Sequence, residues 1–134
     1  MKVSVLQIIL GAIGVVQVIL GIVFLFAPAQ FTTVLGLAVI PAWVPWMFAM
    51  FGARALGFAY GMFLAIRHPD EHRDWIGAMI AVQAIDWIAT IYFVVQGVVT
   101  LPQVSGASFL PLIFIIVLVT RYPRRNTQNA TSAA

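Results

Sequence analysis

Arg54 and Asp86 are the only ionised side chains within the long apolar stretches of this sequence. A charge at the centre of a membrane-spanning helix costs roughly 2.5–3.5 kcal/mol on insertion scales. Such residues persist when they pair with each other, line a cavity or take part in function. As a pair they would form a salt bridge. In a cavity they would bind an anionic or polar ligand, or take part in a proton-linked step.

The spacing of the two charges predicts that they lie at the same depth. Arg54 precedes Asp70 by 16 positions, and Asp86 follows Asp70 by 16 positions. The two helices of a hairpin that turns near Asp70 each rise about 1.5 Å per residue, so equal spacing means equal distance from the turn. The sequence therefore predicts a buried salt bridge between Arg54 and Asp86.

Other polar side chains at membrane depth extend this candidate site. Gln83 precedes Asp86 by about one helical turn and shares its face. A guanidinium has five N–H donors, so a single carboxylate leaves some of them unused. The residues alone leave open whether the pair fixes helix register or forms part of a binding site. The candidate ligand-binding residues are Arg54, Asp86, Gln83, Tyr60, Trp87 and Gln17.

Four apolar stretches must position these residues. The chain has 134 residues, of which 63% are hydrophobic and 8% are charged, whereas soluble domains carry about 25% charged residues. A membrane-spanning helix needs ~20 apolar residues. We therefore predict an all-α fold, an integral membrane antiparallel four-helix bundle formed by a single domain, residues 1–125. The predicted spans are about 5–26, 44–66, 75–99 and 105–120, and residues 126–134 are predicted to be a disordered cytoplasmic tail.

Prolines mark the ends of most of these stretches. Pro28, Pro69 and Pro123 follow three of them, because proline cannot continue a helix. Pro111 is predicted to lie in the first turn of a short fourth helix or at a kink in a longer one. The connection 29–43 is apolar but interrupted by polar and turn residues, so we expect a short interfacial or partly re-entrant segment there.

Glycines predict where the helices approach each other. Gly57 and Gly61 follow Arg54 by about one and two turns, and small residues let membrane helices pack closely. They favour contact between the second and third spans near Arg54. In the first span, a strip that includes Gly14 and Gly21 is predicted to face the interior of the bundle.

The basic residues outside the spans predict the orientation of the chain. The connections 29–43 and 100–104 carry no charge. Because Lys and Arg accumulate on the cytoplasmic side of membrane proteins, both termini are predicted to be cytoplasmic. The basic residues on that side are Lys2, Arg67, Arg73, Arg121, Arg124 and Arg125.

The sequence gives little support to metal binding, thiol chemistry or nucleic-acid binding. His68 and His72 are weak candidates for metal ligands, because they lie four positions apart with carboxylates between them, but a solvated loop of mixed charge explains them as well. The chain has no cysteine, which excludes thiolate metal sites and thiol catalysis. No metal, cofactor or catalytic residue is predicted, and the few basic residues at span ends argue against nucleic-acid binding. Enzymatic activity is left open, with a non-catalytic role favoured.

The pattern Gly52-Ala-Arg54-Ala-Leu-Gly57, followed by Asp86 in the next span, resembles the DoxX-like group of small bacterial four-span membrane proteins. The end of the first span, from Gly21 to Pro28, is similar in style. The resemblance implies a four-helix bundle in the bacterial inner (plasma) membrane with the arginine and aspartate paired inside it. DoxX relatives have been linked to membrane redox systems, including a thiosulfate:quinone oxidoreductase subunit.

Three functions are compatible with this sequence. The first is a non-catalytic subunit or accessory factor of a membrane complex, which requires a membrane-protein partner or a homo-oligomer in the lipid bilayer. The second is a membrane-embedded site for a quinone, a lipid or another small apolar metabolite, with a redox link as one option. The third is an oligomeric transporter. Tight packing around Arg54 and Asp86 would count against the second function, and a cavity touching them would support it.

Overall fold

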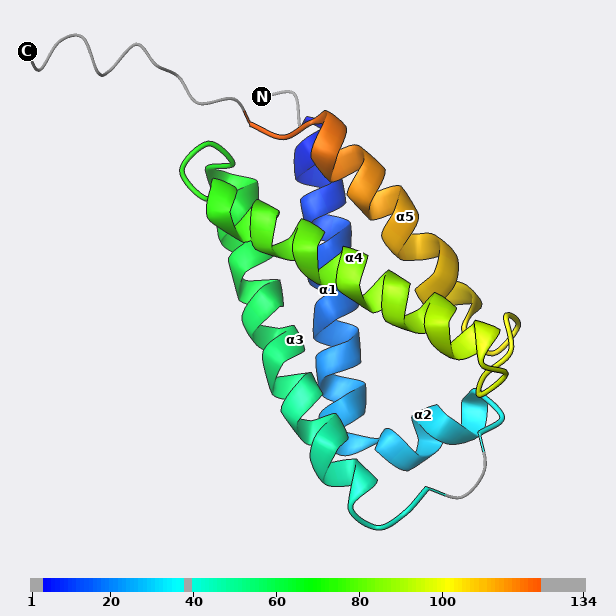
Figure 1. Ribbon diagram of the computed structural model, residues 1–134. Helices are drawn as coiled ribbons and strands as arrows, with labels where there is room; N and C mark the ends of the chain where they lie inside the picture. The colour runs from blue at the N-terminus through cyan, green and yellow to red at the C-terminus, as the bar shows by residue number, and fades with distance from the viewer. Residues whose placement is uncertain (1–3, 38–39, 124–134) are drawn as a thin grey trace, which may run out of the picture.

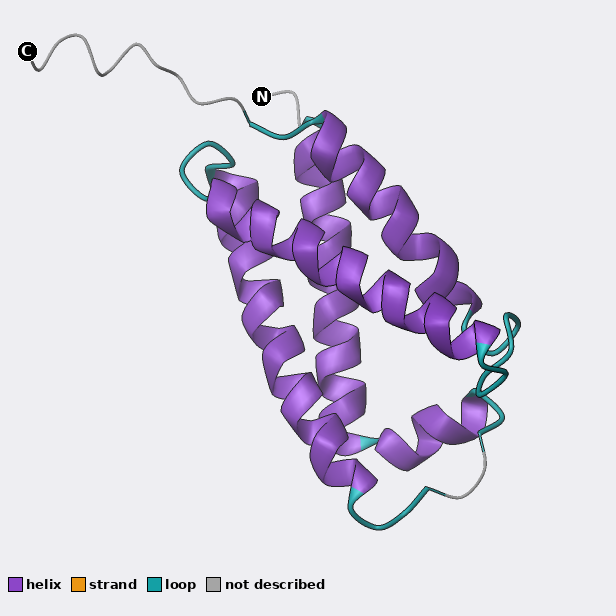
Figure 2. Ribbon diagram, viewed as in Figure 1, coloured by secondary structure: helices purple, strands orange, loops and turns teal. Residues whose placement is uncertain are grey.

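The computed structural model describes residues 4–37 and 40–123, and this part of the chain is helical without any strand (Figures 1 and 2). The prediction of an all-α fold is confirmed for these residues. The predicted tail, 126–134, lies outside them. The helices are α1 (Val5–Phe26), α2 (Pro28–Val34), α3 (Val44–Arg67), α4 (Arg73–Val95) and α5 (Ser105–Thr120).

Three of these helices, α1, α3 and α4, are long and apolar enough to cross a membrane, while α5 is a shorter apolar helix of 16 residues. The third apolar stretch ends as a helix at Val95, earlier than the predicted residue 99. Gly97 has a φ of 72°, and its N–H donates to the carbonyl of Val94 while that of Val98 donates to the carbonyl of Phe93. This Schellman motif ends α4, because glycine adopts a positive φ without a steric penalty.

Polar contacts fix the start of α1. The Ser4 hydroxyl accepts from the Gln7 N–H at 3.2 Å, and the Gln7 side chain accepts from the Ser4 N–H at 3.0 Å. This capping box satisfies two of the donors that a helix leaves unpaired at its start. The Gln7 amide also donates to the carbonyl of Ile66 at 2.9 Å, which joins the start of α1 to the end of α3.

Helix α1 packs most extensively against α3. A Cβ atom on Gly52 would lie 2.8 Å from the carbonyl oxygen of Gly21, so the two backbones come too close for a larger residue at either position. Gly14 also faces α3, where a Cβ would meet the ring of Phe63. Gly14 and Gly21 are buried, as predicted for the first span, and Gly52 of α3 is buried against Gly21.

Helix α4 packs mainly against α5 and shares few contacts with α3. It touches α3 near the 68–73 turn, where the ring of Trp75 covers Gly61 and lies edge-on to Phe58 at 6.4 Å. Beyond that point α4 diverges from α3 and runs toward the start of α5 (Figure 1). The structure therefore consists of two antiparallel pairs, α1 with α3 and α4 with α5, which are joined closely at one end only.

The hydrophobic core lies at that joined end. Its fully buried side chains come from the first halves of α1 and α4 and the second halves of α3 and α5. We call this part of the molecule, which includes the 68–73 turn, the core half, and the remainder the open half. The largest fully buried side chains are Leu10, Ile13, Met62, Ile76, Met79 and Leu118.

Pro111 lies in the interior of α5, which begins at Ser105, and not in its first turn. Proline has no backbone N–H, so the carbonyl of Ala107 loses its usual donor four residues later. Both residues line the cavity described below.

Candidate functional site

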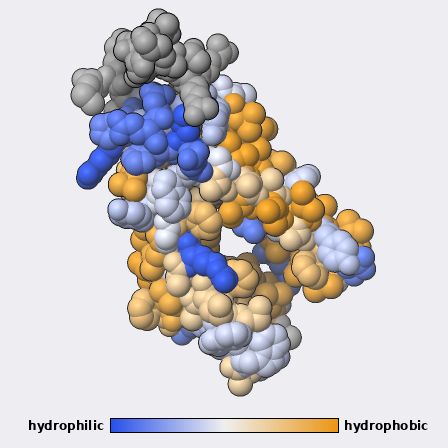
Figure 3. Space-filling model, turned by 60° about the vertical axis from the view of Figure 1, so that its left-hand side comes forward, coloured by the Kyte–Doolittle hydropathy of each residue, from blue (hydrophilic) through white to orange (hydrophobic). Residues whose placement is uncertain are grey.

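A cavity of about 770 Å³ lies between the two helix pairs in the open half. All five helices and the segment before α5 contribute to its wall. We call it the inter-pair cavity. The space-filling view shows an opening through the middle of the molecule, bordered by hydrophobic surface and by hydrophilic surface at its edge (Figure 3).

The inter-pair cavity brings together polar residues from distant parts of the sequence. They are Gln17 from α1, Arg54 from α3, Gln83 and Asp86 from α4, and Gln103 from the connection before α5. Arg54 and Asp86 are the only charged residues among those that line it. Four of the six candidate residues therefore lie around one space.

The predicted buried salt bridge between Arg54 and Asp86 is wrong. No ion pair forms among residues 4–37 and 40–123, and both side chains are exposed to the space around them rather than buried. The physical reason is the divergence of α3 from α4. Equal spacing from the 68–73 turn does not bring two residues into contact when their helices separate beyond the turn.

The remaining two candidates do not line the cavity. Tyr60 is 63% exposed, because six residues turn a helix by about 600°, which directs it away from the face of Arg54. Trp87 faces α5, where its Nε1 donates to the carbonyl of Ser108 at 2.9 Å. This bond ties α4 to the start of α5.

Aromatic side chains form much of the apolar wall. Phe31 of the short helix α2 packs edge-on against Phe24 at 4.9 Å, and the guanidinium carbon of Arg54 lies 5.9 Å from the centre of the Phe51 ring. A cation at this distance is attracted by the ring face. The sequence alone does not single out these phenylalanines, because a phenylalanine beside a cavity and one in a core or facing lipid follow the same pattern.

Gln103 is the polar wall residue that sequence reasoning missed. Its amide donates to the carbonyl of Gly36 at 3.4 Å, which links the connection before α5 to the segment after α2. Its only signal in the sequence was its place in an uncharged connection on the same side as residues 29–43.

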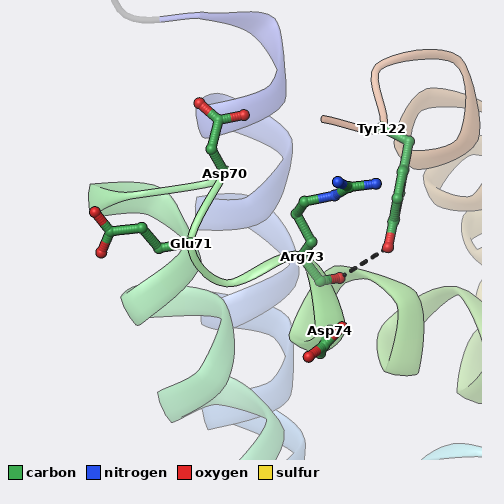
Figure 4. A pocket seen from close by; sticks show the side chains of 5 residues that line it. All are labelled: Asp70, Glu71, Arg73, Asp74 and Tyr122. Carbon is green, nitrogen blue, oxygen red and sulfur yellow. Dashed lines mark hydrogen bonds between the residues drawn. The ribbon is translucent and has the colours of Figure 1, made fainter. Parts of the chain in front are cut away.

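A second recess, of about 370 Å³, lies beside the 68–73 turn (Figure 4). Tyr122 donates to the carbonyl of Arg73 at 3.2 Å, and the carboxylates of Asp70, Glu71 and Asp74 point in different directions. Neither here nor elsewhere in the described residues do three or more His, Cys, Asp or Glu side chains gather as metal ligands would.

The inter-pair cavity has the properties of a ligand site. Ligand pockets usually measure about 300–1,000 Å³ and combine an apolar wall with a few polar groups. This cavity can hold an apolar molecule and offers a cation, an anion and three amides to its polar part. The chain matches no protein-family model, and no curated protein or solved structure is significantly similar to it.

Proposed function

We propose that this protein binds an amphipathic small molecule within the membrane, in the inter-pair cavity. A quinone, a lipid or another small apolar metabolite belongs to this class. The observation that carries the proposal is a cavity of about 770 Å³ touched by both Arg54 and Asp86. Leaving two opposite charges beside an apolar space is costly unless a polar partner satisfies them, and a ligand with a polar group provides that partner.

The proposal includes a four-span arrangement in the bacterial inner membrane, with both termini in the cytoplasm. Helix α5 would serve as the fourth span, since 16 residues extend about 24 Å and the connections on either side can supply the rest. The positive-inside rule places Arg67, Arg73 and Arg121 on the cytoplasmic side. Hydrophilic residues gather at one end of the molecule, which supports this orientation (Figure 3). The motif from Gly52 to Gly57 with Asp86 supports, as a further proposal, a relationship to DoxX-like proteins.

Native mass spectrometry of the purified chain, released from mild detergent with its bound lipids, tests the function. We expect an amphipathic molecule to remain bound, and Ala107→Phe to reduce its occupancy at least tenfold, because the new ring fills cavity space. Ala107 is exposed and lines the cavity, so the helix can accept the ring.

Ala81→Phe is the matched control, because Ala81 is exposed on α4 but does not line the cavity. It should leave the occupancy unchanged. Equal occupancy in wild type and Ala107→Phe would contradict the proposed function.

A second candidate function is that of a subunit or accessory factor of a membrane complex. Ala78, Ala81 and Ala89 are exposed along α4, and small residues allow another membrane helix to approach. Purification in mild detergent followed by cross-linking tests this function. A monomer that carries only small molecules would argue against it.

A further inference from the structure

We infer that the molecule bound in the inter-pair cavity is a single-chain amphiphile with a zwitterionic head, whose anionic group binds Arg54 and whose ammonium group binds Asp86. This inference rests on the proposed function and specifies the ligand class. It follows from the two charges, the acceptors near Asp86 and the shape of the apolar wall.

The charges of the cavity balance each other without forming an ion pair. Arg54 and Asp86 are its only charged wall residues, and the described part of the chain contains no ion pair. An anionic ligand would satisfy Arg54 and be repelled by Asp86, while an uncharged ligand would leave both charges without a counterion. A zwitterion supplies each charge with its opposite, as charge complementarity between ligand and site requires.

The surroundings of Asp86 suit an ammonium group. An ammonium has three N–H donors and needs several acceptors. The Gln83 amide is beside Asp86 in the wall, and Gln83 is only 8% exposed. Pro111 leaves the carbonyl of Ala107 without its usual helical donor. The bond from Trp87 to Ser108 holds α4 beside the start of α5, and Asp86 and Ala107 both line the cavity there.

The surroundings of Arg54 suit an anionic oxygen group. Guanidinium groups bind phosphate and carboxylate through two parallel hydrogen bonds. The ring of Phe51, 5.9 Å away, lies beside the guanidinium. Phe24 and Phe31 continue an apolar wall toward α2, where one acyl chain can lie. A volume of about 770 Å³ falls within the range of small-molecule pockets, which favours one chain over two.

The test compares three ligands that share an oleoyl chain and differ only in the head. They are lysophosphatidylethanolamine, which is zwitterionic, lysophosphatidylglycerol, which is anionic, and monooleoylglycerol, which is uncharged. Native mass spectrometry of the full chain measures the affinity of each. We expect the zwitterion to bind the unmodified protein about tenfold or more tightly than the other two, since it adds one charge-assisted contact that neither can make.

Single substitutions then test which residue binds the ammonium group of the head and which binds its phosphate group. Asp86→Asn should abolish the preference for the ethanolamine head over the glycerol head, because it removes the anion that binds the ammonium. Arg54→Gln should weaken both phosphate-bearing ligands about tenfold and leave monooleoylglycerol unchanged. Arg67→Gln and Asp70→Asn are matched controls, since both residues are exposed outside the cavity, and they should leave all three affinities unchanged.

The outcomes separate this inference from the proposed function. If the anionic or the uncharged ligand binds the unmodified protein as tightly as the zwitterion, the zwitterion inference is overturned and the cavity is still a binding site. If none of the three ligands binds, the zwitterion inference is overturned, and the molecules that co-purify with the chain still decide the proposed function. If Ala107→Phe has no effect on the binding of any molecule, the proposed function itself fails. The comparison of heads on the unmodified protein decides the question even where a variant does not fold.

Discussion

The core half and the open half are built from the same helices and differ in what lies between them. In the core half, side chains from both helix pairs pack against each other, and Met62 and Met79 have no exposed surface. In the open half the same helices enclose about 770 Å³. Gly61 and Gly57 show the change within one turn of α3, because a Cβ on Gly61 would meet Trp75 and one on Gly57 would meet nothing within 4 Å.

A small residue therefore permits close packing of two helices but does not cause it. In a membrane, helices associate through van der Waals contact and polar bonds rather than the exclusion of water. Trp75 supplies that contact at Gly61. No side chain of α4 does so at Gly57, because α4 has already turned toward α5.

Substitutions to alanine in α4 test whether the two halves differ in stability. Met79→Ala should lower the free energy of unfolding by about 2–5 kcal/mol, because it empties space among fully buried side chains. Val82→Ala, one turn further along α4 in the cavity wall, should cost less than about 1 kcal/mol, because it borders an existing space. Denaturation of the detergent-solubilised protein measures both. Equal losses would remove the distinction between the halves.

A smaller effect is expected at the two glycines of α3. Gly61→Ala should destabilise the protein by about 1–2 kcal/mol, because displacing Trp75 outweighs the gain in helix propensity of up to about 1 kcal/mol. Gly57→Ala meets no neighbour and should be neutral or stabilising. Repeating Gly61→Ala in a Trp75→Leu background should abolish its cost. If the cost persists there, contact with Trp75 is not its source.

The smallest effect concerns the bond that holds α4 beside α5. Trp87→Phe should cost about 1 kcal/mol, because it removes the donor to the Ser108 carbonyl and keeps most of the ring. Tyr60→Phe, at an exposed position, should change stability by less than about 0.5 kcal/mol. Thermal unfolding of the two variants side by side provides the measurement. A larger loss in Tyr60→Phe would contradict the role given to Trp87.

Local rules allowed the helices to be predicted better than the site. The bounds of α1 and α5 coincide with their apolar stretches, because proline and a capping box act on the residues next to them. The early end of α4 was missed, although Gly97 carried the signal. The gap between Arg54 and Asp86 was missed for a different reason. The angle between α3 and α4 depends on Trp75, Gly61 and the contacts of α5, and no spacing within one helix encodes it.

The joined end also determines how the molecule can deform. The packed core and the contact of Trp75 with Gly61 hold both helix pairs together near the 68–73 turn. A rigid rotation of α4 about this turn would therefore displace most the residues that lie furthest along the helix. Asp86 lies 13 residues along α4 from Arg73, or about 20 Å from the turn. A rotation of about 10° there moves Asp86 by about 3.5 Å. A rotation of this size would change the separation of Asp86 from Arg54, and with it the width of the inter-pair cavity.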